Sequence, residues 1–443
     1  MAERYYDAVV IGGGVLGCFA ARNLCRYKVS TLVLEAREDI CTGITRANSA
    51  IVYPGYDNKT GSLKAALTVR GNLDMEALCR ELDVPFSRCG SLLVTYDPEA
   101  VPRIEKKLRQ GQRNGVPGLK LLTGEEAEAM EPMLKKGVAA ALYAPTTGTV
   151  NPWQLGIAAM ENARANGAEL LTRAPVTAIE KTPEGYLLRA GEEKIRCRLV
   201  INCAGLCADR VQELVAPSPV KLRLDGAEYL VMEEDMEKPQ RVIFLQAAAC
   251  GKGITAIPCV EGNLLISGSR KELRTHFATT PEGLTQLRQD TRDLLPGIDM
   301  GRVIRSFGAV RPNPETENGD NVSDFCIETP LPGFYSLIGV KTPGLTCANG
   351  LGLHVARLAA GYLGAEENKA FDPRRQAIPQ IPGEIVCQCG NVTRGQILEA
   401  IARGAVTVDG VKRRVGTGMG ACQGSRCSRE IGKLLEEYGH GAL

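Results

Sequence analysis

Four cysteines near the end of the chain are the residues whose type and spacing point most directly to chemistry. Cys387 and Cys389 form a C-x-C pair, and Cys422 and Cys427 follow further along with four residues between them. Thiolates are the ligands of iron–sulfur clusters, and four of them hold one cluster. Structural zinc is the alternative, but its paired cysteines are usually separated by about two to four residues. The spacing therefore favours an iron–sulfur cluster and leaves zinc open.

A glycine motif at the start of the chain indicates a phosphate-binding turn. A short apolar run over 7–11 precedes Gly12-x-Gly14-x-x-Gly17, and a helical pattern follows to about Arg26. The first glycine permits the tight turn, the second lets the backbone approach a pyrophosphate, and the third lets the helix pack closely on the strand. The N-terminus of that helix offers free N–H groups to the phosphates. This order of elements predicts a dinucleotide site.

The second apolar run, Thr31–Leu34, ends in Glu35, where a carboxylate can accept hydrogen bonds from a ribose. The sequence contains no second complete unit of this kind, so we expect one bound dinucleotide. NADH exchanges two electrons together, whereas an iron–sulfur cluster exchanges one, and a flavin can do both. The presence of both motifs therefore favours FAD over NAD.

Composition narrows the remaining possibilities. At 443 residues, with 44% hydrophobic and 23% charged residues, the chain has the size of two or three globular domains. A net charge of +2 indicates neither a nucleic-acid partner nor a membrane surface. No apolar run approaches the ~18 residues of a membrane span, and the first residues lack a signal peptide, so we expect a cytoplasmic protein. With three histidines, a histidine-rich metal site is excluded.

The pattern of elements between the two motifs indicates several domains. The periodicity predicts a helix over Leu63–Leu82, one strand over Glu169–Ile179, and a helix over Gly352–Leu363 that follows a glycine-rich turn. Short strands separated by turns from about Lys221 to Arg270 predict an antiparallel sheet. The polar, proline-containing segment 365–384 has the composition of a linker.

These features resemble a known family. The segment Cys387–Cys427, with "GVKRR" and "GMGACQG", resembles the bacterioferritin-associated-ferredoxin-type [2Fe-2S] domain. The rest is similar to the FAD-dependent D-amino-acid-oxidase-like superfamily, through "TRANSAIVYPGYD", "INCAGLCAD", "KGITAIPCVEGNLLISGS" and "GVKTPGLT". Within it, the chain resembles the A subunit of anaerobic glycerol-3-phosphate dehydrogenase and its relatives, which carry the same two parts in the same order.

The resemblance implies an α/β fold. A Rossmann-like FAD-binding domain would hold an inserted α+β substrate domain with an antiparallel sheet, and a small C-terminal cysteine-rich iron–sulfur domain would follow. The expected boundaries are 1–88, 141–215 and 300–365 for the FAD-binding domain, 89–140 and 216–299 for the substrate domain, 366–384 for the linker and 385–443 for the [2Fe-2S] domain.

Carried over to this sequence, the resemblance also implies three sets of flavin contacts. They are Arg46, Asn48 and Ser49 at the pyrophosphate and isoalloxazine, Gly205 on the adenosine side, and Gly344, Leu345 and Thr346 near the flavin's N1/O2 edge. In the last set, backbone N–H groups would stabilise the negative charge of reduced flavin, as an oxyanion hole stabilises its anion.

For the substrate, the resemblance implies an arginine that faces the flavin, Arg311 in "GAVRPNP", whose planar fork suits a carboxylate or phosphate. Many relatives have a histidine where this chain has Tyr53. The candidates for the base that takes the substrate's proton are Tyr53 and Lys341. His276 lies in a charged stretch and is expected at the surface, and His354 is expected to pack within a helix.

The sequence therefore predicts an FAD-dependent dehydrogenase for a small anionic hydroxy substrate, of the glycerol 3-phosphate or 2-hydroxy acid type. Electrons would leave singly through a [2Fe-2S] cluster, held by the four cysteines, to an electron-accepting protein subunit or a ferredoxin. Two alternatives stay open: an amino- or imino-acid dehydrogenase of the proline, sarcosine or opine type, and a non-catalytic electron-transfer subunit. The resemblance implies a hetero-oligomer, which a partner could bring to the inner membrane.

Overall fold

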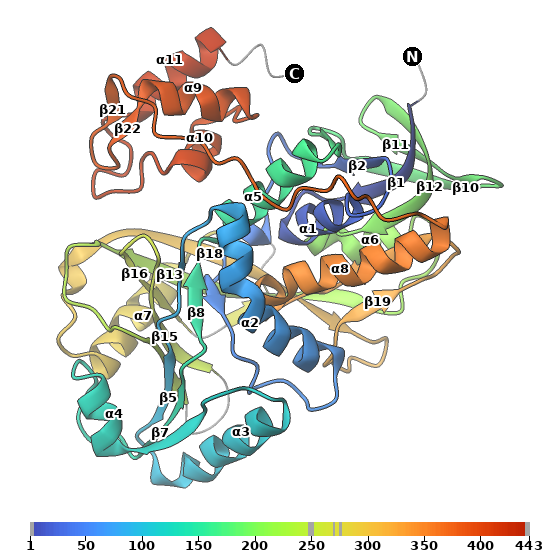
Figure 1. Cartoon of the computed structure of the whole chain (residues 1–443). Coiled ribbons are helices and arrows are strands. Elements are labelled where there is room, and N and C mark those ends of the chain that lie inside the picture. Colours follow the sequence, from blue (N-terminus) through green and yellow to red (C-terminus); the bar gives the residue numbers. More distant parts are fainter. Residues whose placement is uncertain (1–3, 247–251, 269–270, 274–276, 439–443) are drawn as a thin grey trace.

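The computed structural model of the chain describes residues 4–246, 252–268, 271–273 and 277–438. Figure 1 shows three parts: a sheet flanked by helices, a second sheet below it with helices at its edges, and a small helical unit formed by the C-terminal end. The mixed α/β architecture with a small C-terminal domain confirms the predicted fold class. His276 lies outside the described residues, and so does part of the segment that begins at Lys252.

The first sheet is built around the strand that precedes the glycine motif. Strand β1 (Arg4–Ile11) pairs in parallel with β2 (Thr31–Leu34) and with β12 (Glu193–Asn202). Strand β9 (Glu169–Leu171) continues the sheet beyond β2, and β20 (Phe334–Ile338) lies parallel to β12. Parallel strands have their carboxyl ends at one edge of the sheet, which is where ligands bind in such folds.

Helices α1 (Val15–Leu24), α5 (Pro152–Ala165) and α8 (Gly344–Leu363) share one buried apolar cluster with this sheet, and α2 (Leu63–Leu82) packs on α8. The bounds of α2 are those that the periodicity predicts. The remaining elements of this part are β10 (Val176–Thr182), β11 (Gly185–Ala190), β19 (Cys326–Glu328), α6 (Ala208–Gln212), and the short strands β3 (Ile51–Val52), β4 (Phe86–Ser87) and β8 (Gly148–Val150).

The second sheet is antiparallel apart from one pair, β5 and β14, which run parallel. Its longest pairing joins β13 (Lys221–Met232) to β18 (Val303–Glu315). The other strands are β5 (Ser91–Thr95), β6 (Lys120–Thr123), β7 (Ala140–Ala144), β14 (Val242–Gln246), β15 (Lys252–Pro258), β16 (Leu264–Ser267) and β17 (Lys271–Leu273). Helices α3 (Val101–Arg113), α4 (Gly124–Met130) and α7 (Pro281–Leu294) accompany them.

Two predicted elements differ from the structure. The single strand expected over 169–179 is two strands, β9 and β10, because Arg173 adopts a left-handed φ of 54° and Pro175 follows it. The helix expected to begin at Gly352 begins at Gly344, two turns earlier. Its first half contains glycines with low helix propensity, but packing against α1 keeps it helical, and Asn23 there bonds to Asn349.

The C-terminal unit contains β21 (Ile385–Cys387), β22 (Val392–Thr393), α9 (Arg394–Ala402), α10 (Val408–Val415) and α11 (Ser428–Tyr438). Thr393 caps α9, since its hydroxyl accepts from the N–H of Gln396 while the Gln396 side chain accepts from the N–H of Thr393. Helices α9, α10 and α11 bury one apolar core of their own, which includes Ile397, Val411 and Ile431. We call residues 385–438 the cluster unit.

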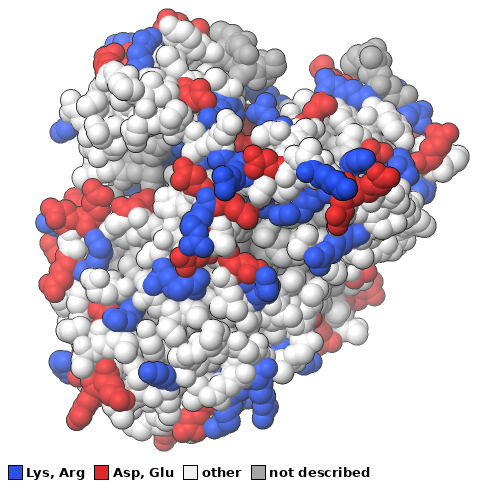
Figure 2. Space-filling view, viewed as in Figure 1, with Lys and Arg blue, Asp and Glu red and all other residues white. Residues whose placement is uncertain are grey.

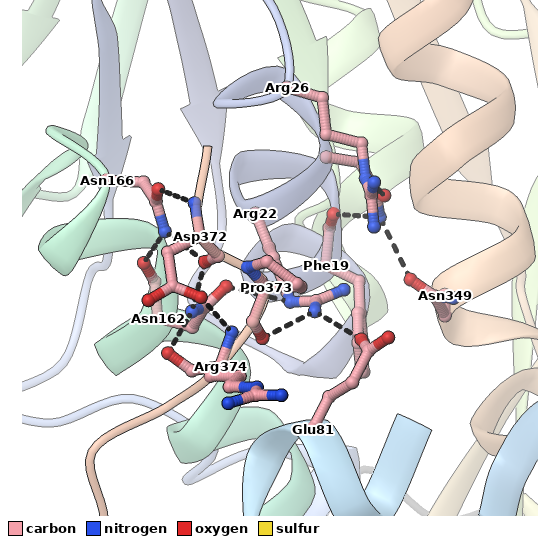
Figure 3. Close-up of polar contacts among 11 residues, drawn as sticks. Phe19, Arg22, Arg26, Glu81, Asn162, Asn166, Asn349, Asp372, Pro373 and Arg374 are labelled. Atoms are coloured by element: carbon pink, nitrogen blue, oxygen red, sulfur yellow. Dashed lines mark hydrogen bonds and ion pairs between the residues drawn. The ribbon is translucent and has the colours of Figure 1, made fainter. Parts of the chain in front are cut away.

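The expected linker, residues 366–384, contains no helix or strand but is fixed by hydrogen bonds (Figure 3). The fully buried guanidinium of Arg22 in α1 lies at the centre of this network. It donates to Asn162 Oδ1 at 2.9 Å, to Glu81 Oε2 at 2.8 Å and to the carbonyl oxygen of Pro373 at 3.0 Å. One buried cation thus joins α1, α2 and α5 to this segment, which we call the strap.

Among the described residues, no helix is both long and apolar enough to cross a membrane. On the face shown in Figure 2, basic and acidic side chains are interspersed with uncharged ones and form no large field of one sign. This agrees with the net charge of +2.

We predict that Arg22→Met destabilises the protein by about 3 kcal/mol, because it leaves buried acceptors without their donor. The free energy of unfolding in denaturant measures this effect. Arg80→Met is the matched control: Arg80 lies on an exposed helix face and forms an exposed ion pair with Glu76, so the change should cost less than about 0.5 kcal/mol. Equal losses in the two variants would contradict a central role for Arg22.

Candidate functional site

A cavity of ≈ 500 Å³ lies between the carboxyl edge of the first sheet and the second sheet. At one end it is lined by Gly12, Gly14 and Glu35, and at the other by Phe244 and Arg311. Its volume is typical of sites for small molecules and cofactors. One continuous site therefore includes residues far apart in the sequence, between Ile11 and Leu345, and from both sheets.

The glycine turn shapes the first end of this cavity. Gly12 has a φ of +106°, and a Cβ there would lie 2.5 Å from the carbonyl oxygen of Cys203. A Cβ on Gly17 would lie 1.8 Å from the carbonyl oxygen of Gly12, so helix and strand could not approach as they do. Gly14 differs, because the nearest atom to its added Cβ is Thr45 Oγ1 at 3.4 Å. Its hydrogen faces a space that the protein leaves free.

Helix α1 begins at this free space. The first N–H groups of a helix have no partner within the helix, and they carry a partial positive charge that attracts phosphate. The hydroxyl of Thr45 accepts from the N–H of Val15 at 3.0 Å. Thr45 lines the cavity and is the first residue of the segment "TRANSAIVYPGYD", but it was not among the predicted site residues. This end of the cavity fits the pyrophosphate of a dinucleotide.

The carboxylate of Glu35 is held at the end of β2 by backbone N–H groups. Oε2 accepts from Gly13 at 2.8 Å, and Oε1 accepts from Arg37 at 2.9 Å. Glu35 also lines the cavity, so the carboxylate lies where the ribose of a dinucleotide at the glycine turn would be. Gly205, with a φ of +59°, lines the same end after β12.

A second helix N-terminus faces the cavity further along. Gly344 and Leu345, the first residues of α8, line it. Thr346 does not: it is 1% exposed, and its hydroxyl accepts from the N–H of Tyr53 at 2.9 Å. The positive end of the α8 dipole therefore points at the cavity, where it would stabilise negative charge on a bound ring system.

The loop that contains the three predicted residues Arg46, Asn48 and Ser49 divides between two environments. Asn48 and Ser49 line the cavity, whereas Arg46 does not. The Arg46 guanidinium lies over the ring of Phe277, 5.3 Å from its centre, and its side chain is largely exposed. We therefore leave Arg46 out of the proposed cofactor contacts.

The three residues predicted to act on the substrate all line the cavity. Arg311 lies on β18, and among the described residues none bonds to its buried Nε. The Tyr53 hydroxyl lies 3.4 Å from Ser49 Oγ. Lys341 donates to Asn313 Oδ1 at 3.1 Å and to Asn321 Oδ1 at 2.7 Å. A cation with a free donor, a phenol and an ammonium group thus border the same space.

The second sheet contributes further lining residues at the Arg311 end of the cavity, and these were not predicted. Phe244 lies on β14, Thr255 on β15 and Ser267 on β16, and all three line the cavity. They follow the alternation of a half-buried strand, which does not distinguish a residue that faces a ligand from one that faces the core. The predicted packing residue His354 is half-buried on α8 and is not among the lining residues.

The four cysteines of the cluster unit form two pairs. Cys389 and Cys422 lie near the surface with their sulfur atoms 3.5 Å apart, while Cys387 and Cys427 are each 1% exposed. The backbone N–H of Gly424 lowers the pKa of Cys422, which favours the thiolate.

In the described part of the chain, no three His, Cys, Asp or Glu side chains converge as one metal ion requires. Two separate pairs of thiols instead suit a two-iron cluster, in which each iron takes two thiolates.

Comparison with known proteins identifies the family. The family model of FAD dependent oxidoreductases matches residues 7–358. The chain belongs to this family. The model of the BFD-like [2Fe-2S] binding domain matches residues 385–437. This family member is thus an FAD-dependent oxidoreductase with a [2Fe-2S] domain, which confirms the predicted cofactors and decides against the zinc alternative.

The chain is 35% identical to "Glycerol 3-phosphate dehydrogenase" of Caloramator mitchellensis over 97% of its own length and 94% of that protein. It is 32% identical to human "L-2-hydroxyglutarate dehydrogenase, mitochondrial" over 48% of its own length and 49% of that protein. The structure of an L-alpha-glycerophosphate oxidase from Mycoplasma pneumoniae, with FAD bound, shares the fold with a TM-score of 0.77 at 23% identity. It covers 85% of this chain, and this chain covers all of it.

For this FAD-dependent oxidoreductase, we predict that Gly14→Ala lowers FAD affinity by at least about tenfold while the fold is retained, because the added methyl group takes space that only the cofactor needs. Flavin content and a thermal melt of the apoprotein measure the two effects. Gly17→Ala should instead reduce soluble, folded protein. Gly297→Ala is the control, since a Cβ there has nothing within 4 Å. Parent-like FAD affinity in Gly14→Ala would place the pyrophosphate elsewhere.

We predict that Cys422→Ser abolishes the cluster and leaves FAD bound, because the thiols and the cavity belong to separate parts of the chain. Iron, acid-labile sulfide and flavin are assayed in the same sample. Cys89→Ser is the control, because Cys89 is partly exposed like Cys422 but lies outside the cluster unit and is not among the residues that line the cavity. A full complement of iron in Cys422→Ser would exclude this residue as a ligand.

Proposed function

We propose that the protein is a dehydrogenase for a small anionic hydroxy substrate, of the glycerol 3-phosphate or 2-hydroxy acid type. Electrons would leave it singly, through the [2Fe-2S] cluster, to an electron-accepting protein. The observation that carries the proposal is Arg311: its buried Nε, for which the described residues supply no partner, borders the cavity that the glycine turn begins. A fixed cation with a free donor is suited to a carboxylate or phosphate.

The relatives support the hydroxy substrate over the amine. The two relatives quoted above, at 35% and 32% identity, are named for glycerol 3-phosphate and L-2-hydroxyglutarate, which are both anions that carry a hydroxyl group. The structures of glycine oxidase and L-proline dehydrogenase resemble the chain at 21% and 19% identity, which is a likeness of fold alone.

In the proposed reaction, the hydroxyl-bearing carbon loses a hydride and its oxygen loses a proton, so that a carbonyl forms. FAD, when bound, supplies the two-electron acceptor, and the cluster supplies the one-electron exit. The residues of the chain orient the substrate and remove the proton. Arg311 would bind the anionic group. Tyr53 as a phenolate or Lys341 as a neutral amine, which border the same space, would take the proton.

The cysteine pairs support the electron exit. Cys389 is exposed and Cys422 is partly exposed, so one side of a cluster held by the four cysteines would be accessible to a protein partner. Cys387 and Cys427 lie in the apolar core of the cluster unit, so they would hold the buried side of the cluster. We propose all four as ligands and a hetero-oligomer as the working assembly.

Anaerobic bleaching of the bound flavin tests the substrate class. The protein is mixed in the absence of oxygen with glycerol 3-phosphate, L-2-hydroxyglutarate, proline and sarcosine in turn. Bleaching by a hydroxy acid or glycerol 3-phosphate supports the proposal. Bleaching by an amine alone would select the amino- or imino-acid alternative. No bleaching by any of these compounds, with flavin and iron intact, would favour the non-catalytic subunit.

We predict that Arg311→Met lowers kcat/KM for the anionic substrate about 100-fold, which corresponds to roughly 3 kcal/mol, because a charge-assisted bond is lost. Steady-state kinetics with an artificial acceptor measures it. Arg311→Lys keeps the positive charge but lacks the planar fork of the guanidinium. Its kcat/KM should fall between those of the parent and of Arg311→Met. Arg223→Met is the control: Arg223 is exposed on the neighbouring strand β13 and pairs with Glu315. A change in Arg311→Met no larger than that in the control would remove Arg311 from the substrate site.

A further inference from the structure

Two buried carboxylates join the cluster unit to the rest of the molecule. The first is Asp39, which follows β2 and is 2% exposed. It accepts two bonds of 2.9 Å from the guanidinium of Arg414 and one of 2.8 Å from that of Arg413. Both arginines lie on α10 of the cluster unit and are themselves buried. One carboxylate therefore holds two cations across the boundary.

Asp39 is ionised in this environment. Burial by itself would raise the pKa of Asp39, but the bonds and charges of Arg414 and Arg413 more than offset it, and the pKa lies below its ordinary value. The fit is also close: a Cβ on Gly410 would lie 3.0 Å from Asp39 Oδ2. Arg414 has further bonds to the carbonyl oxygens of Gly410 and Gly404, so its orientation is set from within the cluster unit.

The second carboxylate is Glu161 on α5, whose side chain is 12% exposed. Its Oε2 accepts from Arg375 of the strap at 2.7 Å and from Arg403 of the cluster unit at 3.2 Å. Arg403 also donates to the carbonyl oxygens of Gln376 and Ala377 in the strap. At this point, α5, the strap and the end of α9 meet at a single acid.

The strap forms a third connection (Figure 3). Asn166, the residue that follows α5, donates to the carbonyl oxygen of Asp372 at 2.8 Å and accepts from its N–H at 2.8 Å. Asn162, one turn earlier, donates to the carbonyl oxygens of Asp372 and Arg374. The chain that enters the cluster unit is thus bonded to α5 through its backbone, which leaves it little freedom to act as a hinge.

We infer that Asp39 and Glu161 are positioning residues, which hold the cluster unit in one orientation against the FAD-binding part so that it does not swing. If the cluster unit rotated against the FAD-binding part without separating from it, the carboxylates and arginines at the boundary would stay buried but lose their partners. Burial of unpaired charge is strongly unfavourable. Three separate connections, at Asp39, at Glu161 and along the strap, fix a rigid body. The docking does not depend on the substrate; its value for electron transfer rests on the electron exit proposed above.

Small-angle scattering and limited trypsin digestion of the full-length, FAD- and iron-loaded protein test the docking. In Asp39→Asn/Glu161→Gln, we expect a larger radius of gyration and roughly tenfold faster cleavage at Arg403, Arg413 and Arg414, because proteolysis follows the population of the open form. Glu399→Gln is the matched control: Glu399 binds the same Arg403 but lies on α9, so this variant should behave as the parent. A parent-like profile and digestion of the double variant would overturn the inference.

Asp39 lies close to the glycine turn, so an effect of the double variant on FAD binding has to be distinguished from undocking of the cluster unit. A second variant does this. Arg403→Gln/Arg413→Gln/Arg414→Gln removes the contacts of the cluster unit to Asp39 and Glu161 from the side of the cluster unit and leaves the carboxylates in place. Its iron content reports whether the cluster unit is folded. The inference requires the same expansion in this variant and faster digestion at Lys412, a neighbouring trypsin site that the substitutions leave in place. An unchanged, iron-loaded protein would contradict it.

A single-turnover experiment separates docking from the electron exit. After anaerobic mixing with substrate, flavin bleaching and cluster reduction are followed by absorbance and by electron paramagnetic resonance. Variants with a full complement of FAD and iron should bleach at the parent rate but reduce the cluster about tenfold more slowly, because the two sites lose their alignment. If the parent itself does not reduce its cluster, the proposed exit fails, and scattering and digestion still decide the docking. An unchanged rate of cluster reduction in variants that have expanded would deny these residues a positioning role.

Discussion

The close approach of α1 to β1 is the constraint on which the cofactor end of this protein depends. Because position 17 is a glycine, helix α1 can pack directly against the carbonyl oxygen of Gly12. A Cβ on residue 17 would lie 1.8 Å from that oxygen. The helix N-terminus therefore lies at the carboxyl edge of the sheet, next to the ends of β12 and β20. The N-terminus of α8 follows β20 at the same edge. Two partial positive charges thus face one cavity, which suits an anionic dinucleotide.

Buried charge organises the rest of the molecule. Arg22, Asp39 and Glu161 are each buried or nearly so, and each has partners from elements far apart in the sequence. Taking such groups out of water is unfavourable, and their partners offset that cost in one arrangement only. These contacts therefore specify how the parts fit together more than they stabilise the fold. Arg311 differs in its position: its buried Nε, which lacks a partner among the described residues, borders the cavity, where a bound ligand would supply one.

Much of the fold follows from local pattern. The glycine turn, the bounds of α2 and the cap of α9 at Thr393 agree with the sequence because each depends on a few neighbouring residues. Strand β18, which carries Arg311, was not predicted. Its run of alternating polar and apolar residues contains two prolines, and only its pairing with β13 makes it a strand of this length. The early start of α8 likewise depends on its packing against α1.

The sequence by itself determined the cofactors, because a phosphate-binding turn and a set of thiolates are defined by residue type and short spacing. The tertiary structure decided which side chains share the cavity: it brings Arg311, Tyr53 and Lys341 to one space and turns Arg46 toward Phe277. It also fixed the cluster unit through Asp39 and Glu161, and it fixed the strap, whose composition is that of a linker. These outcomes depend on contacts between residues hundreds of positions apart, and local periodicity carries no information about such contacts.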